Sequence, residues 1–207
     1  MLTSKSLFHS NLAILFPEQG FAAPDNGAFA ALCGGKGAEG ARFFDDPFAR
    51  TKMLTLPALG LKAVLEGRRL RVEDESASEP DKSRLTVEAS RIAHALFPNT
   101  ALEGFGLNID ATCRFNNVIR IQNMFEHFFG AEPLGRADLR DFGFQFTIDR
   151  GAGNTDIYFI KITAPLEIAL HVNRHFAERT LPAPDRLQQL FEDCYNEIDT
   201  IIAHLKA

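Results

Sequence analysis

The sequence predicts an α+β domain in which a mainly antiparallel sheet of about six or seven strands is covered by two or three helices. Two observations predict this class. Apolar and polar residues alternate along several segments separated by short turns, which is typical of hairpin-linked strands with one buried face. The chain also ends in a long segment, 184–205, whose apolar residues recur at helical spacing. We expect a single domain over 1–207.

The N-terminal segment predicts a strand followed by a long excursion. Residues 6–16 alternate between apolar and polar positions, with Ser10 as an exception, and Pro17 ends the pattern. The residues that share the apolar face are Phe8, Leu12, Ile14 and Phe16. Residues 17–52 are rich in Gly, Ala, Asp and Pro and have little periodicity. We therefore expect an irregular excursion there, with one or two short helices, for example around 28–32.

The next part of the chain predicts a hairpin, an exposed loop and a helix. Residues 61–66 and 70–75 alternate on either side of a GRR turn, which indicates a β-hairpin. Residues 74–83 are acidic and rich in Ser, and we expect an exposed loop. Residues 83–97 carry apolar side chains at helical spacing, with Ser83 suited to the N-cap position.

The strongest strand pattern lies at 105–115, where every second residue is apolar. A helix is predicted after it at 117–129. An antiparallel meander follows, with strands predicted at 142–149, 156–163 and 166–172. The last helix has a stripe of Leu187, Phe191, Cys194, Ile198, Ile201 and Leu205. A stripe widened by Leu190 favours packing on the domain's own sheet over pairing with a second copy.

The composition limits the classes of function. The net charge of −5 disfavours nucleic-acid binding, which depends on Lys and Arg neutralising phosphates. The 19 Phe, against 2 Tyr and no Trp, are expected mostly in the core, with a minority lining a cavity. Cys33, Cys113 and Cys194 are far apart, which indicates neither a disulfide framework nor a zinc site and fits a reducing cytoplasm. No apolar run is long enough to predict a membrane span.

The glycine-rich run CGGKGAEG, 33–40, contains the spacing G-x-G-x-x-G of dinucleotide-binding loops. That motif needs a strand before it, a helix after it and an acidic residue about 20 positions on. The run before it is short, and Pro47 interrupts the run after it. A Walker motif would need Gly at 30 and Ser or Thr at 37, where Ala30 and Gly37 stand. We therefore interpret the run as a loop and expect no cofactor.

Glu167, His171 and His175 are the candidate metal ligands, because on a helix they would lie on one face. The alternation over 166–172 predicts a strand instead. Residues four apart on a strand lie about 13 Å apart, which no single ion spans. The metal site is therefore the lesser alternative.

A polar row on the 105–115 strand is the candidate ligand site. It consists of Asn108, Asp110, Thr112 and Arg114. Opposite charges on an open sheet face suit a ligand groove. The alternative is a solvated face whose side chains pair across strands. No catalytic set is recognised.

The last part of the chain, roughly 120 residues, resembles a sporadically distributed family of uncharacterised bacterial proteins. The resemblance is carried by the segment FPNTALEGFGLNIDATCRF, by the meander, and by LHVNRHF followed by LPAPDRLQQLFEDCYNEIDTIIAHL. It implies a cytoplasmic domain from a bacterium or a phage, and it implies no activity.

Three hypotheses follow for function. The first is a non-enzymatic domain that binds a protein partner or assembles with itself, since no convergent catalytic set is found. The second is a carrier of a small apolar or lipid-like ligand in a cavity between sheet and helix, suggested by the surplus of Phe. The third is a metal-dependent enzyme that uses Glu167, His171 and His175.

Overall fold

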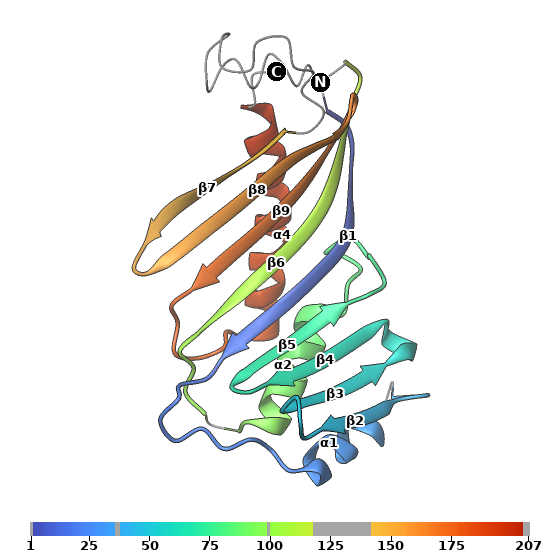
Figure 1. The fold of residues 1–207 in the computed structure, drawn as a ribbon, viewed down its shortest axis with the longest axis vertical. Helices are drawn as coiled ribbons and strands as arrows, with labels where there is room; N and C mark the ends of the chain where they lie inside the picture. Colours follow the sequence, from blue (N-terminus) through green and yellow to red (C-terminus); the bar gives the residue numbers. More distant parts are fainter. Residues whose placement is uncertain (1, 36–37, 99, 118–141, 205–207) are drawn as a thin grey trace.

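A nine-stranded antiparallel sheet forms the centre of the molecule in the computed structural model, which describes residues 2–35, 38–98, 100–117 and 142–204 (Figure 1). The strands are β1 (Leu2–Leu15), β2 (Arg42–Asp46), β3 (Thr51–Leu56), β4 (Leu61–Glu66), β5 (Arg69–Asp74), β6 (Gly104–Phe115), β7 (Phe142–Gly151), β8 (Asn154–Ala164) and β9 (Glu167–Phe176). They lie side by side in the order β2-β3-β4-β5-β1-β6-β9-β8-β7.

The described helices all cover one face of this sheet (Figure 1). We call the other face, which no described helix covers, the open face. They are α1 (Asn26–Cys33), α2 (Leu85–Leu96) and α4 (Pro184–Ala203), with a 3-10 turn at Pro57–Leu59. Helix α4 packs on β1, β6 and α2, whereas α2 packs on β5 and β1, and α1 packs on β2. The predicted α+β class with a long C-terminal helix is confirmed.

The number of strands was predicted too low. All seven expected strands are present, and the two missed ones, β2 and β3, lie in or beside the expected irregular excursion 17–52. They are five and six residues long and form one edge of the sheet. In β2 two aromatic residues stand next to each other before two aspartates, so the strand shows no alternation.

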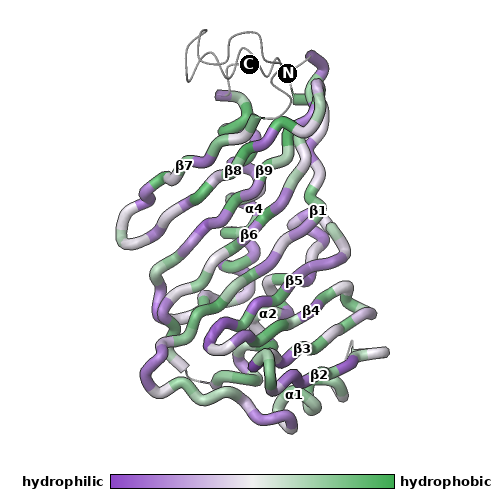
Figure 2. Tube along the Cα trace, viewed as in Figure 1, coloured by the Kyte–Doolittle hydropathy of each residue, from purple (hydrophilic) through white to green (hydrophobic). Residues whose placement is uncertain are grey.

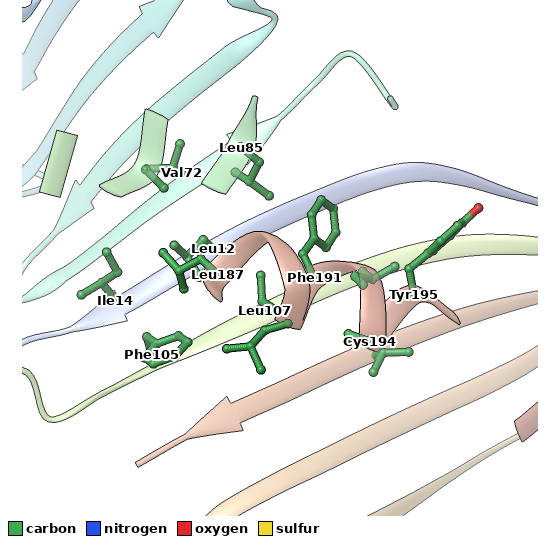
Figure 3. Close-up of a cluster of buried hydrophobic side chains, with 14 of the residues drawn as sticks. Leu12, Ile14, Val72, Leu85, Phe105, Leu107, Leu187, Phe191, Cys194 and Tyr195 are labelled. Carbon is green, nitrogen blue, oxygen red and sulfur yellow. The ribbon is translucent and has the colours of Figure 1, made fainter. Parts of the chain in front are cut away.

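The core lies between the sheet and the helices. Figure 3 shows α4 above β1 and β6, with Leu12, Leu107, Phe191 and Cys194 between them. Hydrophilic and hydrophobic residues alternate along the strands in Figure 2, because successive side chains point to opposite faces. The predicted packing of the last helix on the domain's own sheet is therefore confirmed for its described residues, which do not include Leu205.

A β-bulge in β1 corrects the predicted apolar face of the first strand. The register of β1 against β6 shifts between Leu7 and His9. Because a bulge inserts one extra residue, the alternation changes phase there. Leu7 is therefore buried at 4% exposure, whereas Phe8, expected in the core, is 54% exposed.

The N-cap of α2 lies one residue later than predicted. The N-cap of α2 is Arg84 and not Ser83, although Ser83 Oγ accepts a hydrogen bond from the Leu85 N–H at 3.1 Å. The helix predicted at 117–129 lies almost entirely outside the described residues. In the described part of the chain, no helix is both long and apolar enough to cross a membrane.

Candidate functional site

A hollow of about 470 Å³ opens where β1 ends and β6 begins, beside the last turns of α2. We call it the end hollow. Its floor is apolar and consists of Ile14, Phe16, Ala93, Phe97, Leu102 and Leu181. Its polar groups come from Ser90, His94, Thr100 and Thr180. The volume falls within the range of about 300–1,000 Å³ that is usual for small-molecule sites.

The end hollow exists because neither α2 nor α4 covers this end of the sheet. Helix α2 ends at Leu96, where Pro98 cannot continue the helix. Helix α4 begins only at Pro184. The irregular segment between α2 and β6 is joined to the one between β9 and α4 by a hydrogen bond from the Leu102 N–H to the Arg179 carbonyl at 2.8 Å. Two loops therefore flank apolar floor residues that a helix would otherwise cover.

The chemistry of the end hollow suits a molecule with an apolar body. None of its described lining residues is Asp, Glu, Lys or Arg. Hydroxyl groups and an imidazole provide both donors and acceptors. An apolar body would cover the floor, while a single polar group would bond to the hydroxyl groups and the imidazole.

A cluster of three aromatic rings borders the end hollow. The ring centroids of Phe16 and Phe97 are 4.1 Å apart, and Phe21 lies 5.8 Å from each of them. Phe16 and Phe97 line the end hollow, whereas Phe21 lines a second hollow of about 690 Å³. We call this second space the hairpin hollow, because its other walls come from the β2–β3 and β4–β5 turns.

Two of the charged side chains of the hairpin hollow, Lys52 and Arg68, bond to the segment between β1 and α1. Lys52 Nζ donates to the carbonyl of Pro24 at 2.8 Å and to Asn26 Oδ1 at 2.7 Å. The Arg68 guanidinium donates to the Phe16 carbonyl at 2.7 Å and pairs with Glu103. These two cations thus fix the backbone around the aromatic cluster.

A polar cluster lies on the open face, where Asp110 of β6 accepts hydrogen bonds from two histidines. His9 Nδ1 of β1 lies 2.8 Å from Asp110 Oδ2, and His171 Nδ1 of β9 lies 2.7 Å from Asp110 Oδ1. Burial opposes ionisation of Asp110, but the hydrogen bonds from the two histidines outweigh it, so the pKa of Asp110 is lowered. Because an ionised carboxylate only accepts hydrogen bonds, both Nδ1 atoms act as donors, and neither Nε2 atom is used in the contact with Asp110.

The predicted ligand residues on β6 lie on the open face and pair with neighbouring strands. Asn108 donates to Asn11 Oδ1 at 2.9 Å, and Arg114 donates to Glu167 at 3.1 Å. Thr112 lies opposite Ser6 on β1. The sequence did not indicate His9, because its place beside Asp110 depends on the bulge and on the β1–β6 register. A ligand groove on this face remains a prediction.

The candidate metal ligands are spread along β9. His171 is engaged by Asp110, Glu167 by Arg114, and His175 lies opposite Gly106. Positions four apart on a strand are about 13 Å apart. The structure therefore does not bring these three side chains together. Within the described ranges, no three His, Cys, Asp or Glu side chains form a group that could hold a metal ion.

An ion cluster around the buried Asp156 joins α4 to the β7–β9 part of the sheet. Asp156 of β8 has no exposed surface and accepts from Arg174 at 2.7 and 2.8 Å and from Arg150 at 2.8 Å. Both arginines also pair with Glu197 of α4. Burial opposes ionisation of Asp156, but the two arginines lower its pKa below the usual value. With two cations and two carboxylates, the cluster is internally neutralised and has a structural role.

Two of the three cysteines and the glycine-rich run do not provide the groups that the corresponding motifs need. Burial raises the pKa of Cys113 to about 11 and that of Cys194 to about 12, so both thiols stay protonated at neutral pH. The glycine-rich run follows helix α1 and leads into strand β2, which is the reverse of the order a dinucleotide loop needs. Its Lys36 and Gly37 lie outside the described residues.

Comparison with protein-family models, with curated protein sequences and with solved structures found no match to this chain. The resemblance to an uncharacterised bacterial family and the cytoplasmic location therefore remain predictions.

Proposed function

We propose that the protein binds a small, largely apolar molecule in the end hollow. The observation that carries this proposal is a hollow of about 470 Å³ that reaches buried floor residues and has no Asp, Glu, Lys or Arg among its described lining. Removing an alkyl chain from water onto such a floor is favourable by about 0.8 kcal/mol per methylene. Ser90, His94, Thr100 and Thr180 provide hydrogen bonds for one polar group.

The occupant is an uncharged amphipathic molecule, such as a medium-chain alcohol. A carboxylate or phosphate would lose its hydration without gaining a lysine or arginine partner from the described lining. This choice narrows the carrier hypothesis that the sequence suggested.

The test places a bulky side chain in the end hollow by substituting one of its lining residues. Ala93 of α2 is buried and lines the hollow, whereas Ala95 is exposed on the same helix. We expect Ala93→Phe to abolish saturable binding of 1-octanol, measured by calorimetry, while Ala95→Phe binds as the wild type does. Because the new ring enters open space, Ala93→Phe should change the free energy of unfolding by less than the 1–3 kcal/mol typical of overpacking. Equal binding by the wild type and Ala93→Phe, or no binding by the wild type, would refute the proposal.

Self-association is a second candidate function, supported by the β2–β3 hairpin. Phe48 at its turn is 98% exposed, and Phe44 of β2 is 56% exposed. β2 is also an edge strand, and edge strands are prone to pair with a second copy. If self-association occurs through this hairpin, light scattering will give the mass of a dimer for the wild type and of a monomer for the Phe44→Ser/Phe48→Ser variant. A monomeric wild type would contradict it.

A further inference from the structure

We propose that Phe21 closes the end hollow toward the hairpin hollow and so sets the longest alkyl chain that the end hollow accepts. This inference rests on the proposed function. The Phe21 ring packs against the rings of Phe16 and Phe97, which line the end hollow, while Phe21 itself lines the hairpin hollow. A chain that extends along the floor past Phe16 therefore meets this ring.

Phe21 is the one ring of the cluster that is not fully buried. Phe16 is 1% exposed and its N–H bonds to the Arg68 carbonyl at 3.0 Å beside the end of β1. Phe97 is buried and caps α2. Phe21 is half-buried on the irregular segment before α1, next to Gly20, which has a left-handed φ of +80°. Removing the Phe21 ring therefore alters the wall without removing a side chain from the sheet or from a helix.

The space behind Phe21 can receive an alkyl chain. The hairpin hollow measures about 690 Å³, and its lining combines the apolar side chains of Ala23, Pro47 and Leu65 with the charged side chains of Glu18, Asp45, Arg50, Lys52 and Arg68. Lys52 is held by Pro24 and Asn26, and Arg68 by Phe16 and Glu103, so these cations are already engaged. A truncated side chain at position 21 would join the apolar floor of the end hollow to the apolar part of the hairpin hollow, formed by Ala23, Pro47 and Leu65.

The test is a chain-length series. The affinities of 1-hexanol to 1-tetradecanol are measured by calorimetry on the full-length wild type and on Phe21→Ala. For the wild type we expect affinity to rise about fourfold with each added methylene until the chain fills the end hollow, and then to stop rising. In Phe21→Ala the rise should continue to longer chains, with the affinities of the short alcohols unchanged.

Two further variants control for altered folding. Phe43 is also half-buried and its ring lies 5.0 Å from that of Phe29, but it lines neither hollow, so Phe43→Ala should keep the wild-type limit. Phe21→Trp keeps a ring in the wall and should have the same limit or a shorter one. Circular dichroism of each variant establishes that it is folded.

The outcomes separate this inference from the proposed function. Binding of alkanols to the wild type with the same length limit in Phe21→Ala would overturn the role of Phe21 alone. A shift of the limit by Phe43→Ala as large as that by Phe21→Ala would also overturn it. If no alkanol binds the wild type, or if Ala93→Phe binds as well as the wild type, the proposed function and this inference are both wrong.

Discussion

The part of the sheet beneath α4 and the end of the sheet beside α2 use similar apolar residues in different ways. Beneath α4, Leu107 of β6 and Phe191 and Ile198 of α4 have no exposed surface, and the two elements pack against each other. Beside α2, Phe16 and Leu102 are also buried, yet they border a hollow. The difference arises because a helix of 20 residues crosses the first region, whereas two loops flank the second. Burial of a side chain therefore does not by itself separate core from binding site.

The two regions also differ in the kind of polar group that they contain. The region beneath α4 contains a cluster of charges around Asp156, in which each carboxylate has arginine partners. The end hollow has hydroxyl groups and one imidazole at its polar positions. Paired charges stabilise the first region, whereas hydroxyl and imidazole groups suit recognition of a polar group in the second.

The largest expected effect comes from breaking the ion cluster around Asp156. Asp156→Asn leaves Arg150 and Arg174 without their buried carboxylate, and removing one partner of a buried ion pair costs about 3–5 kcal/mol. Chemical denaturation should show this loss, while 1-octanol binding to the folded protein stays unchanged. Asp193→Asn, on the exposed side of α4, is the control and should change stability by less than about 0.5 kcal/mol. A loss of octanol affinity in Asp156→Asn under folding conditions would show that the two regions are coupled.

Truncating one buried leucine in each region tests how closely the two regions are packed. Leu107→Ala creates a cavity beneath α4 and should cost about 2–5 kcal/mol in unfolding free energy. Leu102→Ala removes the same atoms next to existing open space, so the added cavity cost is smaller and the loss should fall below that of Leu107→Ala. Urea denaturation of both variants measures the difference. Equal losses would mean that the end hollow is filled by packed side chains in solution.

The smallest expected effect concerns Asp110 on the open face. Because the folded state lowers its pKa, the stabilisation by ionised Asp110 is present above the unfolded pKa of about 3.9 and is lost as pH falls through the lowered value. Asp110→Asn should cost about 1 kcal/mol at pH 7. It should also make stability fall less steeply below about pH 4. Denaturation between pH 7 and 2 tests this, with the exposed Glu178→Gln as the control. An unchanged acid dependence in Asp110→Asn would contradict the assigned hydrogen bonds.

Periodicity predicted the regular parts of the fold and little of the candidate site. The alternation at 105–115 and the helical spacing at 184–205 correspond to β6 and α4, because each buries one complete face. The edge strand β2 was missed because its sequence does not alternate, and Phe8 was misplaced because a bulge shifts the phase of β1. The end hollow is built from loop and helix-end residues far apart in sequence, such as Phe16, Phe97 and Leu181. No local pattern encodes their proximity.

The most direct measurement of the central claim is an NMR experiment on the wild type with bound 1-octanol. If the uncovered end of the sheet is a binding site, intermolecular nuclear Overhauser effects will connect the octanol methylene protons to Phe16, Phe97, Leu102 and Leu181. Contacts confined to residues beneath α4, or to the exposed Phe44 and Phe48, would contradict it.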